Sequence, residues 1–402
     1  MSSSPVVRAS GGSAPTSVTR SLGLLLPCAL LVLTQLYVAI PLVSPVAREI
    51  GHGNAPAASA ALATTYGIAY AVGLLVFGPL SDRYGRKAIL VPGLLALAVS
   101  TAGVSAADSL GLLGALRGIQ GLSAASFPPV ALAYLGEALP VRYRATAIGA
   151  MSTAFLSAGI VGQVYASILT SAWGWRGVFG LSAALVLLAA IAVAVILREP
   201  TRAAPGSSLA QRYRRIAKLA VRRELALPVA SAFPVLLSFV AMYAALGPWL
   251  QANFGLGQTE ILLVRLAGLP AMLLGPLAGA LAGRIGARTV LLAGFLVAAL
   301  GLALEAGAGG SLIALVAASV IFVAGVTMTV PTHIALIGAR AGTERAGGLG
   351  LYSFVLFVGA SVGPLATQLP LGFPVLLLAL SALLLAGTGL VSLSSGRAAR
   401  ER

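Results

Sequence analysis

Long apolar runs alternate with short polar segments along almost the whole chain. Each run is close to the roughly 20 residues that an α-helix needs to cross the hydrocarbon core of a bilayer. Lipid offers no hydrogen bonds to the backbone, so runs of this length predict membrane-spanning helices. The pattern predicts an all-α membrane protein with twelve spans, at residues 22–44, 58–80, 88–106, 110–136, 145–170, 175–197, 228–252, 259–281, 288–306, 311–333, 347–369 and 371–394.

Three polar stretches frame these spans and suggest the domain boundaries. Residues 1–21 are rich in Ser, Gly and Pro, which is typical of a disordered tail. The first apolar run is longer than a signal-peptide core and has no convincing A-x-A site after it, so we expect a retained helix. A basic linker at 198–227 then separates six spans (22–197) from six more (228–394), and 395–402 form a second tail.

Composition and charge support this interpretation. The chain has 402 residues, of which 58% are hydrophobic and 9% charged, and its single cysteine, Cys28, excludes a disulfide within the chain. The net charge is +16, and 22 of the 26 Lys and Arg residues fall in alternate connecting segments and tails. By the positive-inside rule both termini and the linker are cytoplasmic, in an inner (plasma) membrane. No basic face interleaved with aromatic residues supports binding of nucleic acid.

A charged turn, which we call the clasp, separates the second and third runs. It reads Gly78-Pro-Leu-Ser-Asp82-Arg83-Tyr-Gly85-Arg86-Lys87. This stretch resembles the signature loop G-x-x-x-D-R-x-G-R-[RK] between helices 2 and 3 of the major facilitator superfamily. The resemblance covers residues 22–394 and implies two six-helix bundles that rock about a central cavity.

The two halves of the chain repeat, as that duplicated architecture implies. A weaker copy, Gly279-Ala-Leu-Ala-Gly283-Arg284-Ile-Gly286-Ala-Arg288, lies 201 residues after the clasp. Tyr37-Val-Ala-Ile-Pro41 has a looser echo in Tyr243-Ala-Ala-Leu-Gly-Pro248. Small-residue faces for helix packing are expected at Gly275, Gly279 and Gly283 and at Gly359 and Gly363.

In carriers of this family the clasp closes the cytoplasmic side of the molecule. We expect Asp82 to face the positive end of the helix dipole near Gly347, a contribution of about 0.3–1 kcal/mol. Glu137, at the cytoplasmic end of the fourth span, can pair with Arg83 or Arg86. The alternative is that these residues serve only loop packing and topology. The gate residues expected are Gly78, Asp82, Arg83, Gly85, Arg86, Lys87 and Glu137.

Three polar residues inside spans are candidates for coupling or binding. Arg117, in Arg117-Gly-Ile-Gln120-Gly121, resembles the R-x-x-q-G motif of drug:proton antiporters, in which the arginine is linked to proton movement. A structural bond to a carbonyl or acid is the alternative. Arg265 either meets an anionic or hydroxylated substrate or snorkels to the outer surface. His333, near Pro331, either carries protons or bonds the backbone.

The sequence departs from the antiporter pattern in two respects. The fifth span lacks the proline of the family's kink motif, and no Asp or Glu lies in the middle of a span; Glu305, Asp108 and Glu260 lie near outer ends. A pump for cationic drugs is therefore disfavoured, and we expect a neutral, amphipathic pocket. Its candidate residues, with Arg265, are Gln35, Tyr37, Tyr66, Gln163, Tyr243, Trp249 and Tyr352.

The sequence as a whole predicts a monomeric secondary carrier in the lipid bilayer. Its expected task is proton-coupled export of a small amphipathic or sugar-like molecule. An importer or facilitator for a metabolite, with an anionic one favoured by Arg117 and Arg265, is the alternative. A membrane sensor without transport is a weaker one. We find no metal-ligand cluster, nucleotide loop or nucleophile–base set, so neither an enzyme nor a cofactor is expected.

Overall fold

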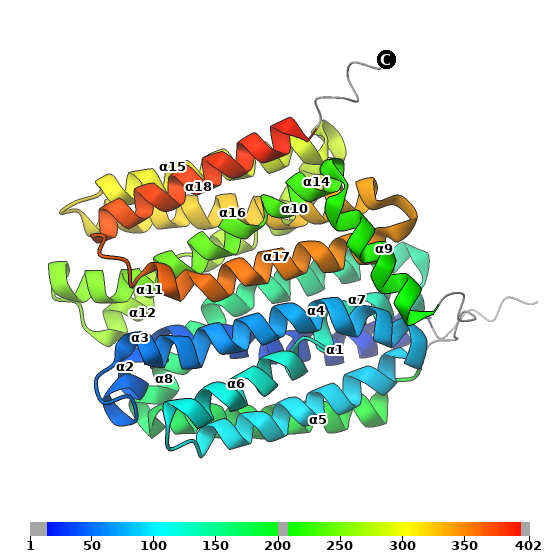
Figure 1. Ribbon diagram of the computed structural model, residues 1–402, viewed down its shortest axis with the longest axis horizontal. Helices are drawn as coiled ribbons and strands as arrows, with labels where there is room; N and C mark the ends of the chain where they lie inside the picture. Colours follow the sequence, from blue (N-terminus) through cyan, green and yellow to red (C-terminus); the bar gives the residue numbers. More distant parts are fainter. Residues whose placement is uncertain (1–13, 200–207, 395–402) are drawn as a thin grey trace, which may run out of the picture.

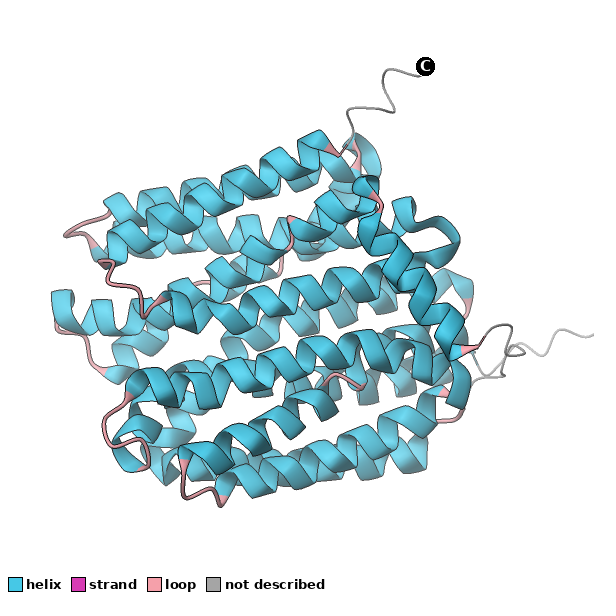
Figure 2. Cartoon of the chain, viewed as in Figure 1, coloured by secondary structure: helices cyan, strands magenta, loops and turns pink. Residues whose placement is uncertain are grey.

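The described residues fold into a bundle of helices that run side by side. The computed structural model describes residues 14–199 and 208–394, and the described residues contain helices and loops without strands (Figures 1 and 2). The predicted tails fall largely outside this range, at 1–13 and 395–402, as does part of the linker, 200–207. The all-helical fold predicted from the apolar runs is confirmed.

The first half of the chain forms the lower part of the bundle in Figure 1. The first span breaks at Val38, three residues before Pro41, and the second contains a π-helical turn at Ala60–Thr64, near its start. The elements are α1 (Ala14–Tyr37), α2 (Ala39–Glu49), α3 (Ala55–Ser59), the π-helix η1 (Ala60–Thr64), α4 (Thr65–Tyr84), α5 (Arg86–Ser105), α6 (Leu110–Ala124), α7 (Phe127–Ala138) and α8 (Val141–Ile196).

The second half forms the upper part, and helix α9 crosses one end of the bundle. The span from α12 to α14 is broken into three pieces around Gly268 and Leu274. The elements are α9 (Leu209–Val221), α10 (Arg223–Ala230), α11 (Phe233–Phe254), α12 (Gln258–Leu266), α13 (Leu269–Met272), α14 (Gly275–Ile285), α15 (Ala287–Gly307), α16 (Leu312–Ala341), η2 (Gly342–Glu344), α17 (Arg345–Ala366) and α18 (Phe373–Leu393).

Helix α8 is a hairpin rather than one rod of 56 residues. Gly174 has φ 68° and ψ 175°, a conformation outside the helical region that glycine adopts without strain. The Tyr165 hydroxyl lies 3.0 Å from Ser182 Oγ, although in a straight helix these residues would be about 25 Å apart. The two arms therefore run antiparallel, as the separate predictions for 145–170 and 175–197 require.

Ten helices of the described chain are long and apolar enough to cross a membrane. One of them, Ser157–Ile196, crosses the bend of α8 and so contains part of its first arm and the whole of its second. The fourth predicted span is absent from the ten because it breaks between α6 and α7, ahead of Pro128 and Pro129. With the second arm of α8 and the α6–α7 pair, the helices account for the twelve predicted spans.

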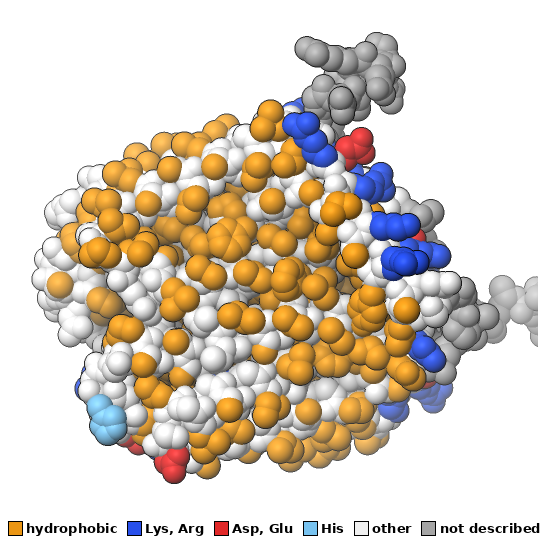
Figure 3. Space-filling view, in the orientation of Figure 1, with side chains coloured by type: hydrophobic (Ala, Val, Ile, Leu, Met, Phe, Trp, Pro, Cys, Tyr) orange, Lys and Arg blue, Asp and Glu red, His pale blue; other side chains and the backbone are white. Residues whose placement is uncertain are grey.

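The flanks of the bundle are apolar, and its charge gathers at one end. Val99, Val195 and Ile313 are 72%, 77% and 83% exposed, which suits contact with lipid rather than water. Lys and Arg side chains cluster at the end of the bundle where α9 lies, and hydrophobic side chains (orange) are spread over the visible flank (Figure 3). We call the end with α9 the basic end, and the end with His52 the opposite end.

The two copies of the clasp motif share one backbone geometry. Gly85 has φ 108° and ψ 155°, and Gly286 has φ 90° and ψ 137°. Each glycine joins two spans, α4 to α5 and α14 to α15, in a conformation that strains other residues. The internal repeat read from the sequence therefore extends to backbone conformation.

Small residues pack closely in α17 but not in α14. A Cβ on Gly359 would lie 2.1 Å from the Phe233 carbonyl oxygen, and one on Gly363 would lie 2.8 Å from Val240 Cβ. Gly279 and Gly283 have nothing within 4 Å of that position. The predicted packing face of the eighth span is therefore wrong for Gly279 and Gly283, which are exposed, whereas Gly275 is buried.

Candidate functional site

Arg86 is the centre of the clasp. Its side chain is 10% exposed, and its Nε and Nη2 donate to Glu137 Oε2 and Oε1 at 3.1 and 2.5 Å. Its Nη1 also lies 2.5 Å from Asp82 Oδ1 and donates to Ser81 Oγ at 2.6 Å. A forked guanidinium pairs with a carboxylate in this way, so of the two partners considered for Glu137 the structure gives Arg86.

The other basic members of the clasp are less constrained. Arg83 is exposed and lies over the neighbouring Tyr84 ring at 5.5 Å. Gly78 has open space around it, whereas Gly85 provides the turn itself. Arg86 and Asp82 thus make the contacts between elements, and Arg83 faces outward.

Glu199, which sequence reasoning missed, caps the helix that starts at the clasp. Its Oε1 and Oε2 accept hydrogen bonds from the backbone N–H groups of Arg86 and Lys87 at 2.6 and 2.8 Å. A carboxylate is favoured at a helix N-terminus because free N–H groups and the helix dipole both point there. Glu199 therefore ties the end of α8 to the start of α5.

Helix α9 joins the clasp to the second half of the chain. Arg212 Nη1 lies 2.8 Å from Asp82 Oδ2, and the Tyr213 hydroxyl donates to the Val76 carbonyl at 3.1 Å. Partial burial raises the pKa of the Tyr213 hydroxyl above its ordinary value. On the other side Arg215 pairs with Glu344 at 3.1 Å.

The first turns of α17 also face α9. A Cβ on Gly347 would lie 3.0 Å from Ile216 Cγ1 and 3.5 Å from Leu219 Cδ1. The described partners of Asp82 are Arg86 and Arg212, so the linker helix takes the place expected for the α17 dipole. Arg214 and Lys218 are exposed on the outer side of α9.

Arg117 is fully buried and is held by carbonyl groups. Its Nε donates to the Leu62 carbonyl at 2.7 Å and its Nη2 to the Gln35 carbonyl at 3.0 Å. Leu62 lies in the π-helical turn and Gln35 at the end of α1, just before the helix breaks. The guanidinium also lies over the Tyr66 ring at 4.2 Å, a cation–π contact.

Gln120 completes the network around Arg117. Its Oε1 accepts from Arg117 Nη1 at 2.6 Å, and its Nε2 donates to Thr101 Oγ1 at 2.7 Å and to Gln35 Oε1 at 3.3 Å. The next residue, Gly121, packs so closely that a Cβ there would lie 2.1 Å from the Tyr66 carbonyl oxygen. The R-x-x-q-G spacing thus builds a buried polar joint between α1, η1, α5 and α6.

Aromatic rings meet where the two halves of the chain touch. Tyr37 packs edge-on against Phe239 with centroids 6.1 Å apart, and Tyr70 against Phe357 at 4.7 Å. Tyr66 stacks on Tyr70 at 5.9 Å. Tyr70 was missed in the sequence, although it lies four residues after Tyr66 and so on the same helix face.

Several buried polar side-chain atoms in the two halves have no hydrogen-bond partner among the described residues. A buried polar group without a partner destabilises a protein by about 1–3 kcal/mol, so these atoms are candidates for contacts with another molecule. From the first half these atoms are Tyr66 Oη, Tyr70 Oη and Gln163 Oε1, and from the second Ser238 Oγ, Tyr352 Oη, Arg265 Nε and Glu305 Oε2.

The remaining predicted residues separate into interior and peripheral ones. Gln35, Tyr37, Gln163, Tyr243 and Tyr352 are at most 6% exposed. Trp249 is partly exposed and stacks on Phe373 at 5.0 Å, which suits packing of helix ends.

His333 is buried, and each of its ring nitrogens has a partner. Its Nε2 lies 2.9 Å from Ser231 Oγ and its Nδ1 lies 3.1 Å from the Thr329 carbonyl oxygen. Its ring also stacks on Tyr352 at 5.3 Å. These contacts favour the backbone-bonding interpretation of this histidine.

Two charged residues in the second half differ from the sequence-based picture. Arg265 is 6% exposed, so the snorkelling alternative is wrong. Glu305, near the end of α15, is 2% exposed, and its Oε1 accepts a hydrogen bond from Ser319 Oγ at 2.9 Å. The second half of the chain therefore does contain a buried acid.

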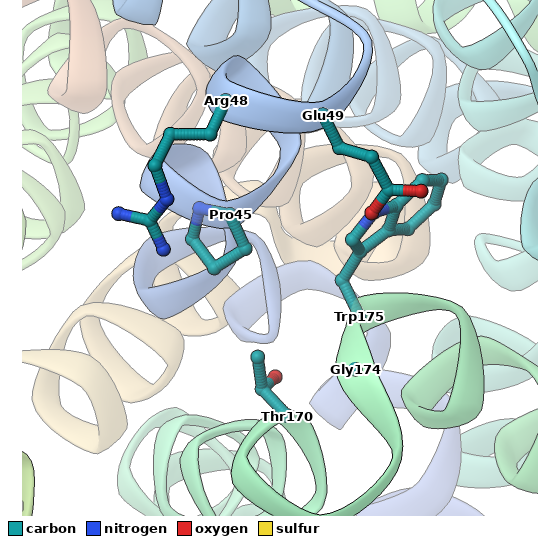
Figure 4. Close-up of a pocket in the computed structure, with 6 residues that line it drawn as sticks. All are labelled: Pro45, Arg48, Glu49, Thr170, Gly174 and Trp175. Atoms are coloured by element: carbon teal, nitrogen blue, oxygen red, sulfur yellow. The ribbon is translucent and has the colours of Figure 1, made fainter.

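A small pocket of about 350 Å³ lies at the opposite end, between α2 and the bend of α8. Figure 4 shows Arg48 and Glu49 on its two sides, with the Trp175 ring beside Glu49 and Thr170 below. Glu49 Oε2 accepts from Trp175 Nε1 at 2.6 Å, and its Oε1 pairs with Arg176. Glu49 therefore anchors the α8 hairpin to α2.

The apolar flanks and the repeated halves define a multi-pass membrane protein of the carrier type. Comparison with known families gives the same answer, because the profile of the Major Facilitator Superfamily matches residues 25–364. The chain belongs to this superfamily, whose members are transporters rather than enzymes.

Individual relatives support the assignment. "Probable transporter SCO4007" of Streptomyces coelicolor is 28% identical over 321 residues, 77% of this chain and 71% of the relative. The "Tetracenomycin C resistance and export protein" of Streptomyces glaucescens is 31% identical over 33% of this chain and 25% of the relative. The chain covers 22–38% of the length of the tetracenomycin protein and of five other curated relatives.

A solved structure shows the same fold. The crystal structure of the human organic anion transporter MFSD10 (TETRAN) aligns with a TM-score of 0.68, covering 93% of this chain and 99% of that one. The sequences are 17% identical, so the likeness concerns the fold.

Proposed function

We propose that this protein exports a small amphipathic molecule across the inner membrane by alternating access, driven by the proton gradient. The observation that carries this proposal is the aromatic layer where the two halves meet, which we call the central layer and which contains the unpartnered buried hydroxyls of Tyr66 and Tyr70. Further unpartnered buried atoms lie in the first half at Gln163 and in the second at Ser238 and Tyr352. Aromatic rings surround these atoms, so a ligand with hydroxyl or carbonyl groups on an apolar frame fits them best.

The two halves then act as the moving bodies. We assign them to residues 22–197 and 228–394, joined by the linker at 198–227 that contains α9. The contacts of α9 with Asp82 and with Glu344 hold the halves together at the basic end. Breaking these contacts opens the central layer to the basic end. Each chain carries both halves, so the carrier works as a monomer.

The direction of transport rests on the names of relatives. The tetracenomycin protein and the multidrug resistance proteins 1 and 3 of Bacillus subtilis all match parts of this chain. A rival proposal is import or facilitated transport of an anionic metabolite, which the unpartnered Arg265 Nε favours.

A transport assay separates these proposals. The purified protein is reconstituted in liposomes with an imposed pH gradient, and the uptake of ethidium, fluorescein and a neutral sugar analogue is compared. Gradient-driven flux of the neutral sugar analogue supports the first proposal, and selective flux of fluorescein supports the rival. No flux and no counterflow for any probe contradicts both.

Orientation is tested separately. We propose that the basic end is cytoplasmic together with both termini, since most of the Lys and Arg residues lie on that side. A reporter fused between residues 200 and 208, or after residue 402, is expected on the cytoplasmic side. A periplasmic signal from either fusion contradicts this topology.

A further inference from the structure

Toward the opposite end, a direct hydrogen bond joins helices from the two halves of the chain. The Thr64 hydroxyl, at the last position of η1, donates to the Ser361 carbonyl of α17 at 3.3 Å. A Cβ on Gly67 would overlap Ser361 Oγ, so the backbone of α4 lies directly against this serine, which is 1% exposed. We call the contact made by Thr64, Gly67 and Ser361 the Ser361 contact.

The Ser361 contact lies beyond the central layer, on the side away from the clasp. Thr64 precedes the start of the clasp by 14 residues, and Ser361 follows Gly347, which faces α9, by 14 residues. Each of these stretches is about 21 Å long in a helix. Tyr70 packs on Phe357 between the two levels, at 4.7 Å. The contacts of α9 and the Ser361 contact therefore close the central layer at its two ends.

Arg117 contacts the chain on both sides of Thr64. Its Nε donates to the Leu62 carbonyl at 2.7 Å, and its guanidinium lies over the Tyr66 ring at 4.2 Å. Gly121, one helical turn further along α6, packs so closely that a Cβ there would overlap the Tyr66 carbonyl oxygen. Helix α6 therefore fixes the backbone at Leu62 and Tyr66, and with it the direction in which the Thr64 hydroxyl points.

The π-helical turn makes this support necessary. Such turns are rare and mostly occur as single turns within α-helices, frequently at functional sites. Leu62 lies in the middle of η1 and Thr64 at its end. If the turn reverted to a regular α-helix by one residue, the chain before it would rotate by about 100° relative to α4. Leu62 and Tyr66 would then no longer both face Arg117, so the contacts of Arg117 stabilise the π-helical form.

We propose that Arg117 is a positioning residue for closure at the opposite end, because it holds the π-helical turn so that Thr64 meets Ser361. The described contacts of Arg117 lie in the first half of the chain, so it acts on α17 through Thr64. The role depends on the shape and donors of the guanidinium, and no proton has to leave it. This inference rests on the proposed function for its link to transport, but not for closure itself.

Distances between spin labels at each end measure closure without any substrate. With Cys28→Ala as the background, one pair of labels is placed at Ala55→Cys and Gln368→Cys, exposed positions of the two halves at the opposite end. A second pair, at Val195→Cys and Ile285→Cys, reports on the basic end. Double electron–electron resonance on the protein in lipid nanodiscs then gives the ratio of open to closed molecules at each end.

Removal of the Thr64 hydroxyl is expected to open the opposite end alone. In Thr64→Val the open-to-closed ratio there should rise about five-fold, the change that one net hydrogen bond makes, and it should stay constant at the basic end. Thr64→Ser keeps the hydroxyl and should restore the wild-type ratio. Thr388→Val is the matched control, because the Thr388 hydroxyl donates at the same distance of 3.3 Å to a carbonyl of its own helix, α18. It should change neither ratio.

Arg117→Ala should open the same end, whereas a merely structural arginine would lower the melting temperature without a selective change at one end. The double variant with Thr64→Val should open no further than Arg117→Ala, because the arginine acts through the threonine. If Arg117→Ala does not fold, Arg117→Lys takes its place, since an ammonium cannot reproduce the forked contacts of the guanidinium.

Three results overturn the proposal: a wild-type ratio at the opposite end in the folded Arg117 variant, a wild-type ratio there in Thr64→Val, or additive effects in the double variant. The expected label distances together with no transport by the wild type contradict the proposed function alone.

Discussion

Arg212 of the linker helix reaches Asp82 of the clasp at 2.8 Å, so one residue outside both helical halves holds the turn between α4 and α5. Asp82 is shared, because its other oxygen lies 2.5 Å from Arg86. The same linker helix pairs with Glu344, next to α17, through Arg215. Closure at the basic end is therefore a three-part contact, in which α9 lies between the halves.

Replacing Asp82 by Asn tests this contact. The change keeps the size of the side chain but removes the charge that pairs with Arg86 and Arg212. Partly exposed pairs contribute at most about 1 kcal/mol each to stability, so we expect normal insertion and a small drop in melting temperature. Transport is expected to fall strongly, and cysteines introduced in the central layer should label faster from the basic end.

The matched control for Asp82→Asn is Arg214→Gln, which removes an exposed cation from the outer side of α9. It should leave both transport and labelling unchanged. If Asp82→Asn transports at the wild-type rate, the clasp serves topology alone.

Gly85→Ala tests the turn itself. At φ 108° and ψ 155° a residue with a Cβ is strained, and holding a residue in such a region lowers the free energy of unfolding by about 1–3 kcal/mol. We expect a lower melting temperature together with reduced transport. Gly78→Ala is the control, because Gly78 lies within α4 and nothing approaches its Cβ position within 4 Å. Equal stability of the two variants would contradict a special role for the Gly85 backbone.

Arg117 is predicted to serve both structure and transport. Replacement by Lys keeps the charge, but an ammonium cannot bond Leu62, Gln35 and Gln120 with the geometry of the guanidinium. Each buried acceptor left unpaired destabilises the fold by about 1–3 kcal/mol, so melting temperature should fall in both Arg117→Lys and Arg117→Ala. We also expect gradient-driven transport to be lost per folded molecule.

Two measurements on the same purified Arg117 variants separate the roles. Transport that falls only in proportion to folded protein would indicate a purely structural arginine. Arg48→Gln, at the exposed opposite end, is the control for loss of a cation and should change neither quantity.

How far the sequence predicted these features depends on the distance between the interacting groups. Hydropathy located the spans because each satisfies its own backbone, and the clasp motif led to Arg86 and Glu137. Glu199 was missed because its partners are backbone N–H groups more than 110 residues away. Burial of Glu305 was missed because its position near a span end is compatible with either a wet or a packed side chain, and only the fold brings Ser319 to it.

The same limit explains the error in α14. Glycines four residues apart allow close helix packing, but they do not determine whether a neighbour is present. In α17 the neighbour is α11, which meets Gly359 and Gly363, whereas in α14 Gly279 and Gly283 are exposed.

We make opposite predictions for two tyrosines, Tyr70 in the central layer and Tyr165 in the α8 hairpin. Tyr70 Oη is buried without a described partner, so Tyr70→Phe removes an unsatisfied group and should leave the melting temperature equal or higher. Tyr165 Oη donates to the Val178 carbonyl at 3.2 Å and lies 3.0 Å from Ser182 Oγ. Tyr165→Phe should therefore lower the free energy of unfolding by about 1 kcal/mol and with it the melting temperature. If substrate binds the central layer, the KM for transport should change in Tyr70→Phe and not in Tyr165→Phe, the reverse of the effect on stability. Tyr70→Phe should raise the KM for a hydroxylated probe, while Tyr165→Phe keeps it. A lower melting temperature with unchanged KM in Tyr70→Phe would mean that its hydroxyl is structural and that the substrate binds elsewhere.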